Sequence, residues 1–258
     1  MSLASENTKH AESEIDEWTV RCELAAIYRL LSHLHMSDLI YTHVSARLPG
    51  WRDRFLINRY GMLFHEIRAS DLIEVDETGT AVNAAPGAAA EVNAAGFNIH
   101  SAVHSGRPEV RFVIHTHTRA GAAVSCQRGG LLPISQQALM FHQKLGYHDY
   151  EGFALSLEER AQLIADLGSH NAMVMRNHGL LAVGRTAAEA FSRIYMLERA
   201  CEIQIAAMAG GGDLVIPPAA VQARTASQAN PEGQADWETL AWTSALRLIA
   251  PAQPDYRS

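Results

Sequence analysis

The chain has 258 residues, of which 48% are hydrophobic, and it carries a formal net charge of −7 at pH 7. This length allows one sizeable core without demanding two domains. The negative charge leaves no basic field for phosphate backbones or anionic lipid, so we expect no nucleic-acid partner, no membrane partner and a small-molecule substrate.

The expected location is the cytoplasm, because the polar N-terminal segment and the rest of the chain contain no apolar run long enough to cross a bilayer. The three cysteines, Cys22, Cys126 and Cys201, are widely spaced and include no CxxC pair, which predicts reduced thiols. Histidine is the unusual residue, with 13 copies.

The N-terminal segment combines a polar arm, residues 1–12, with the beginning of a helix. Ser13 and Asp16 have the spacing of a capping box, which predicts that the helix opens here. One side of this helix is expected to pack on a sheet through Trp18, Leu24, Tyr28, Leu31 and Leu34.

Short strands are predicted next, at Ile40–Leu48, Arg54–Ile57 and Asp71–Asp76, from their β-like composition and the turns between them. A second helix is predicted over Glu91–Ser105. It should end there because Pro108 disfavours helical backbone at the residue before it.

A central strand is predicted at Val110–His117, which is rich in β-branched and aromatic residues and leads into a small-residue helix at Arg119–Ser125. Ala172–Met175 and Leu180–Val183 flank the sequence Arg-Asn-His-Gly like the two arms of a hairpin. Hairpins of this kind indicate an α/β fold with a mixed, largely antiparallel central sheet covered by helices.

Two further helices are predicted from their caps. One opens at Ser156 and stops near Gly168, and a longer one opens at Thr186 with Glu189 and runs to about Ala209. After three glycines, residues 213–234 are predicted to form a linker and Ala235–Ala250 an amphipathic helix. The expected organisation is therefore an arm (1–12), one domain (13–212) and a tail (213–258).

The histidines near the central strand suggest a metal site. Side chains two apart in a strand share a face, so His115 and His117 present their imidazoles side by side. His178, at the hairpin tip beside Gly179, could supply a third nitrogen and leave one side open for substrate. The alternative is that His115 and His117 are partly buried strand residues satisfied by backbone carbonyls.

Several motifs together resemble the class II aldolase/adducin family, over roughly residues 18 to 209. Besides the HxHT at the end of the strand, they are DLIYTHVSAR (Asp38–Arg47), INRYGMLFHEI (Ile57–Ile67), AGFNIHSAVHSGRPEV (Ala95–Val110), GLLPIS (Gly130–Ser135) and RNHGLL (Arg176–Leu181). The resemblance implies an αβα sandwich and a homotetramer with active sites at subunit boundaries.

The resemblance also implies that His115, His117 and His178 bind a divalent metal ion, usually zinc, although an all-imidazole site would accept manganese or iron as well. The adducin head, a binding module on this fold, is described as lacking a complete metal set. Retention of all three histidines therefore favours an enzyme.

The sequence departs from the sugar-phosphate aldolases of this family in the residues expected to bind phosphate and move protons. Their serine pair and acidic residue are replaced by Ala94, Ala95 and Gly96, and an early asparagine is replaced by His43. The favoured proton-transfer residue is His100, which matches a family histidine. The other candidates are Glu91, His104, His43, Tyr147 and His148.

The sequence motifs are compatible with three functions. The first is a metal-dependent lyase, an aldolase or decarboxylase, that acts on a small hydroxy-carbonyl or carboxylate substrate through a metal-stabilised enolate. The second is a non-haem iron oxygenase on the same three histidines. The third is a non-catalytic adducin-like binding module.

Overall fold

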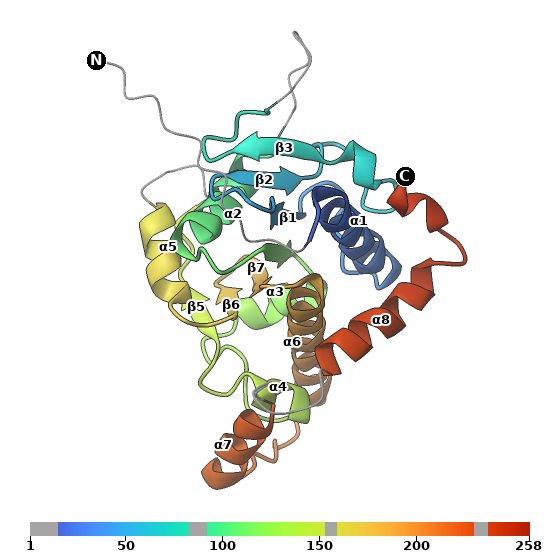
Figure 1. The fold of residues 1–258 in the computed structure, drawn as a ribbon. Coiled ribbons are helices and arrows are strands. Elements are labelled where there is room, and N and C mark those ends of the chain that lie inside the picture. Colours follow the sequence, from blue (N-terminus) through green and yellow to red (C-terminus); the bar gives the residue numbers. More distant parts are fainter. Residues whose placement is uncertain (1–14, 83–91, 153–158, 230–236) are drawn as a thin grey trace.

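Residues 15–82, 92–152, 159–229 and 237–258 are described by the structure, a computed structural model (Figure 1). None of the helices within these ranges is long and apolar enough to cross a membrane.

A seven-stranded sheet forms the centre of the fold, in the order β3-β2-β1-β4-β7-β6-β5. Its strands are β1 (His43–Arg47), β2 (Arg54–Ile57), β3 (Ile73–Asp76), β4 (Phe112–Thr116), β5 (Gly146–His148), β6 (Ala172–Met175) and β7 (Gly179–Gly184). Every neighbouring pair is antiparallel except β5 with β6, which is parallel. The predicted mixed, largely antiparallel sheet is thus confirmed, as is the central position of β4.

Helices cover both faces of the sheet, which makes the fold an αβα sandwich (Figure 1). The helices are α1 (Glu17–His33), α2 (Ala94–Gly106), α3 (Arg119–Ser125), α4 (Gln136–Met140), α5 (Glu159–Leu167), α6 (Ala187–Met208), α7 (Ala219–Gln228) and α8 (Trp237–Ile249). Strand β4 shows how the layers are filled. Phe112 and Ile114 join the cluster with α1 and α6, whereas Val113 faces the cluster with α2 and α5, because successive side chains of a strand point to opposite faces.

Helix α1 begins later than the sequence pattern predicts. Asp16 is its N-cap and accepts a hydrogen bond from the backbone N–H of Thr19, so the predicted opening at Ser13, which lies outside the described residues, is wrong. Trp18 is 48% exposed rather than packed, since it stands in the first turn, on the solvent side of the buried stripe. Helix α2 likewise starts after its N-cap Asn93, and Glu91 lies outside the described residues.

The segment predicted to be a linker contains helix α7, so that prediction is wrong for Ala219–Gln228. Helix α7 packs against α4, and its Ala226 is buried and accepts a hydrogen bond from Lys144 at 2.5 Å through its backbone carbonyl. The alanine- and glutamine-rich sequence has no strong apolar stripe. Tertiary contact stabilises the helix instead.

The C-terminal tail runs along the outside of the sandwich and ends beside α1 (Figure 1). The amphipathic helix predicted at the tail is α8, whose Trp242 is buried and lies edge-on to Phe191 of α6, with ring centroids 5.6 Å apart. Tyr256 is buried in the main core, and Asp255 pairs with Arg29 of α1 at 3.1 Å. The tail is therefore anchored to the body of the protein.

Candidate metal centre

Three elements bring the candidate histidines together at one end of the sheet. His115 lies in β4, His117 follows the end of that strand, and His178 occupies the turn between β6 and β7. Because β4 pairs with β7 in a register that matches Thr116 with Leu180, the hairpin tip lies directly beside the end of β4. His117 and His178, which are 61 residues apart in sequence, thereby become neighbours.

The hairpin tip has a backbone that only certain residues tolerate. A Cβ at Gly179 would lie 2.3 Å from the carbonyl oxygen of Thr116, so no other residue fits there without moving the strand. Asn177 adopts the left-handed conformation (φ 55°), which asparagine accepts more readily than most residues. The backbone N–H of His178 donates to Ser125 Oγ at 3.2 Å. These contacts fix the position of the third imidazole.

The three imidazoles converge through the same ring nitrogen. His117 Nε2 lies 2.8 Å from His115 Nε2 and 2.9 Å from His178 Nε2. The three candidate ligand atoms lie within 4.8 Å of one another. His115 is fully buried, whereas His117 and His178 are partly exposed, so the cluster can be reached from outside.

The partners of the outer ring nitrogens decide which nitrogens carry protons. His115 Nδ1 lies 2.9 Å from the carbonyl oxygen of Leu180, which can only accept, so this nitrogen must donate. His117 Nδ1 lies 3.3 Å from an Asp38 carboxylate oxygen, which requires the same tautomer. In the neutral rings both Nε2 atoms then carry lone pairs, and these face each other.

Such facing lone pairs repel unless a cation lies between them. Metal-binding histidines typically have the outer nitrogen held by a carbonyl or a carboxylate, as those of His115 and His117 are here. A proton shared among the rings is disfavoured. Burial, with the neighbouring histidines, lowers the pKa of His115 well below its usual value and that of His178 to about 4. Burial also lowers the pKa of His117, against the opposing effect of Asp38. The residues present therefore fit a divalent metal ion with open positions.

The alternative interpretation, histidines satisfied by backbone carbonyls, accounts for only part of this geometry. His115 Nδ1 does have a backbone partner, but the convergence of the three Nε2 atoms needs another explanation. The sequence did not single out Asp38 as a site residue, because it lies 79 residues before its partner His117.

His43 and Gly96 form a steric pair beside the histidines. A Cβ at Gly96 would lie 2.2 Å from His43 Cδ2 and 2.3 Å from His43 Nε2, so the imidazole fills the space that a side chain at position 96 would need. His43 pairs with His115 across the sheet, and their ring centroids are 5.2 Å apart. Gly96 and His43 both depart from the aldolase pattern, and the small residue at one position therefore compensates in volume for the large side chain at the other.

His100, the favoured proton-transfer residue, lies behind His43 rather than beside the three histidines. It is 2% exposed. Its Nε2 is 2.7 Å from His43 Nδ1 and its Nδ1 is 2.5 Å from Ser45 Oγ, so both ring nitrogens are already engaged. Ser45 Oγ also lies 2.8 Å from His104 Nε2. This placement supports an indirect role for His100, as a residue that positions His43.

The remaining proton-transfer candidates have structural contacts. Tyr147 accepts a hydrogen bond from the backbone N–H of Leu131 at 3.1 Å. His148 is buried at the end of β5, with Nδ1 2.8 Å from an Asp166 carboxylate oxygen. His104 stacks on Phe55, with ring centroids 4.5 Å apart.

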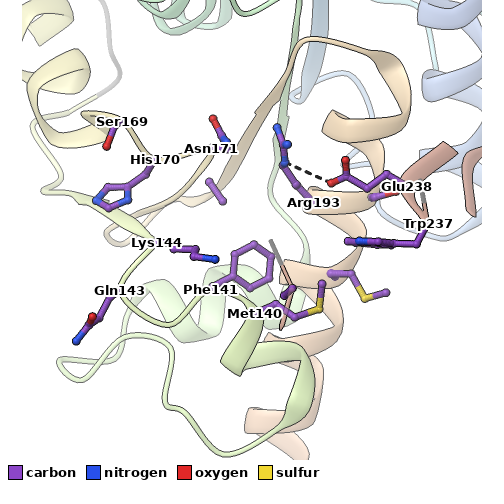
Figure 2. A pocket seen from close by; sticks show the side chains of 14 residues that line it. Met140, Phe141, Gln143, Lys144, Ser169, His170, Asn171, Arg193, Trp237 and Glu238 are labelled. Carbon is purple, nitrogen blue, oxygen red and sulfur yellow. Dashed lines mark ion pairs between the residues drawn. The ribbon is translucent and has the colours of Figure 1, made fainter. Parts of the chain in front are cut away.

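A separate cavity of about 360 Å³ lies where the tail meets the body (Figure 2). Figure 2 shows Trp237 and Glu238 of the tail helix on one side, with an ion pair of 3.6 Å between Glu238 and Arg193. Phe141 and Lys144 contribute to its wall. None of the three converging histidines lines this cavity, so it is distinct from the candidate metal centre.

Comparisons with a family model and with known proteins all point to one family. Residues 22–205 match the family model described as "Class II Aldolase and Adducin N-terminal domain". A protein of Pseudomonas aeruginosa, whose name assigns it provisionally to the class 2 aldolases, is 46% identical over 96% of this chain and 95% of its own length. Rat alpha-adducin is 39% identical over 88% of this chain, which spans only 31% of the adducin.

Two solved structures superpose closely on this chain. An aldolase II superfamily protein from Pseudomonas syringae superposes with a TM-score of 0.88 at 46% identity, covering 95% of this chain and 98% of that one. L-fuculose 1-phosphate aldolase from Glaciozyma antarctica PI12 superposes with a TM-score of 0.83 at 26% identity, covering 96% of each chain.

Proposed function

The chain belongs to the class II aldolase and adducin family, and from this premise we propose that it is a divalent-metal-dependent carbon–carbon lyase. Its substrate would be a small hydroxy-carbonyl or carboxylate compound, cleaved by a retro-aldol reaction or by decarboxylation. The observation that carries the proposal is the convergence of three imidazole Nε2 atoms, with the outer nitrogens of His115 and His117 held by a carbonyl and a carboxylate.

His115, His117 and His178 would hold the metal ion. We propose zinc, and the all-imidazole donor set would also accept manganese or ferrous iron. When bound, the ion would act as a Lewis acid toward a substrate oxygen and stabilise negative charge beside the carbon–carbon bond that breaks.

The protein's own residues supply orientation and a restricted opening. Asp38 and the Leu180 carbonyl hold two of the imidazoles in place, and the partial exposure of His117 and His178 leaves access for a small molecule. Gly96 offers no proton-transfer group where the sugar-phosphate aldolases carry an acid, and the His43 ring blocks that volume. Decarboxylation needs no base to begin, so this arrangement favours it over cleavage of a phosphorylated sugar.

Turnover in the presence and absence of oxygen tests the proposed reaction class. The purified protein with its bound metal would be incubated with panels of β-hydroxy-carbonyl compounds and β-keto or hydroxy acids, and the products would be followed by mass spectrometry. A lyase should release the same fragments with and without dioxygen. Products that contain oxygen from labelled dioxygen, formed only aerobically, would indicate the iron oxygenase instead.

Binding without catalysis is the second candidate function, favoured by the 39% identity to alpha-adducin. It predicts that no compound in either panel is turned over, even when the protein carries a full complement of metal. We also propose that residues 13–212 form the catalytic unit, that residues 213–258 dock on it, and that the protein assembles as a homotetramer.

Replacing Asp38 with asparagine should weaken metal binding by about 10- to 100-fold, the usual effect of altering a group that orients a ligand. An amide lacks the negative charge that favours the Nδ1–H tautomer of His117. Competition with a chelator of known affinity would measure the change. Asp149→Asn is the matched control, because the Asp149 carboxylate is exposed and no hydrogen bond or ion pair joins it to the three histidines among the described residues. Equal affinity in both variants would contradict a role for Asp38.

A further inference from the structure

A second cavity, of about 570 Å³, lies at the end of the sheet opposite the histidines. It is lined by the end of β1 and the residues that follow it, by those that precede β4, and by the segment between β7 and α6. The lining includes four arginines, Arg47, Arg52, Arg111 and Arg185. Strand β1 runs from His43 to Arg47, so the two ends of this strand alone are separated by about 13 Å at the usual rise per residue.

The four arginines carry more positive charge than their surroundings neutralise. Within the described part of the chain, none of Arg47, Arg52, Arg111 and Arg185 forms an ion pair at 4.0 Å or less. Glu109, the carboxylate in the cavity wall, is paired with Arg107 at 2.5 Å. This concentration of unpaired charge is unexpected in a chain whose net charge is −7.

Arg47 contributes fixed positive charge to the site, because backbone carbonyls occupy most of its donors. It is 8% exposed, and its guanidinium donates to the carbonyl oxygens of Val110 and Arg107 at 3.3 Å each and to those of Arg52 and His104. Burial and the nearby charges of Arg111 and Arg52, opposed by Glu109, lower its pKa to about 10, so it remains charged at neutral pH.

Electrostatic neighbours moderate this charge without removing it. Glu23 interacts with Arg111, but Arg52 and Arg185 are exposed and have their guanidinium groups free among the described residues. Thr186, which also lines the cavity, is the N-cap of the 22-residue helix α6. The carboxylate of Glu189 in the first turn accepts a hydrogen bond from the backbone N–H of Arg185 at 2.9 Å. This carboxylate offsets the positive end of the helix, so the positive charge of the cavity comes from the arginines.

We propose that this cavity binds a small molecule carrying two phosphate groups or a diphosphate, at a site separate from the metal centre. A planar guanidinium donates two parallel hydrogen bonds to phosphate oxygens, so arginines suit phosphate better than a point charge would. Several arginines around one cavity match a ligand with more than one negative group. This inference does not depend on the proposed lyase activity.

Titration calorimetry with inorganic pyrophosphate tests the proposal. The titrations would use the metal-loaded protein and also the His115→Ala, His117→Ala double variant, because pyrophosphate could bind the metal itself. Both proteins should bind pyrophosphate with similar affinity, and more weakly as sodium chloride is added, because salt screens charge. Binding should be at least about tenfold weaker in an Arg52→Ser, Arg185→Ser variant, each lost contact to a charged group having a sizeable effect.

Three outcomes would overturn the proposal. Unchanged binding in the Arg52→Ser, Arg185→Ser variant would show that the arginines are not the site. Loss of binding in the histidine variant would assign it to the metal centre. Citrate binding as tightly as pyrophosphate would contradict the preference for phosphate. An Arg224→Ser, Arg247→Ser variant is the matched control, because it removes two exposed arginines of the tail helices and should bind as the unmodified protein does.

Discussion

Alanine at both His115 and His117 is expected to lower the metal content of the purified protein from about one ion per chain to less than about a tenth of that, since one remaining imidazole cannot hold a catalytic ion. His117 Nε2 lies between those of the other two histidines, at 2.8 and 2.9 Å. Elemental analysis of protein purified without added metal measures the result. Lyase turnover should fall with the metal.

The control for this variant removes two histidines that lie on the surface. His33 and His65 are exposed, and a His33→Ala, His65→Ala variant should keep both its metal and its activity. Circular dichroism would establish that the His115→Ala, His117→Ala protein still folds, because His115 is fully buried and its truncation leaves a small cavity.

The identity of the ion directs the next step. Zinc or manganese would support the lyase, and iron would direct attention to oxygen-dependent turnover. If the unmodified protein contained no metal and bound none on titration, the lyase proposal would fail. An adducin-like binding module would then account best for the similarity to alpha-adducin.

Gly96→Ala is expected to lower the free energy of unfolding by about 1–3 kcal/mol, the usual effect of overpacking a buried site, and to reduce turnover as well. The added methyl group would lie 2.2 Å from His43 Cδ2. The imidazole cannot easily move away, since it is buried, held by His100 at 2.7 Å and packed near the His115 ring. Urea denaturation and steady-state turnover measure the two effects.

Shortening His43 should relieve the clash. A Gly96→Ala, His43→Asn variant is expected to be more stable than the sum of the single changes predicts, with a coupling of about 0.5–3 kcal/mol, the range for residues in contact. Additive effects in this double-mutant cycle would contradict the steric pair. If His43 also takes part in the reaction, the double variant should recover stability without recovering turnover.

Local sequence patterns determined much of this fold. Alternating side chains in Val110–His117 predicted both a central strand and the shared face of His115 and His117, because strand periodicity is a property of the backbone itself. The hairpin around His178 followed from two short apolar runs joined by a turn, and Thr186 predicted the start of α6 because capping involves residues only three apart.

The resemblance to a family extended these local predictions to the αβα sandwich and to a role for all three histidines. The resemblance did not predict the contacts that each residue makes. His100 matched a family histidine, yet the structure places it behind His43 with both ring nitrogens engaged. Helix α7 was missed because its stability comes from packing on α4 rather than from its own sequence.

Only the tertiary structure decided which distant residues meet. Asp38 reaches His117 across 79 residues of sequence, His43 fills the space above Gly96, and the arginines that surround the second cavity come from the end of β1 and from three separate loops. Their meeting depends on strand order and register, which are set by the packing of the whole core. The sequence by itself therefore predicted the candidate ligand set and its local spacing, whereas the groups that contact these histidines and fill the space around them were decided by long-range packing.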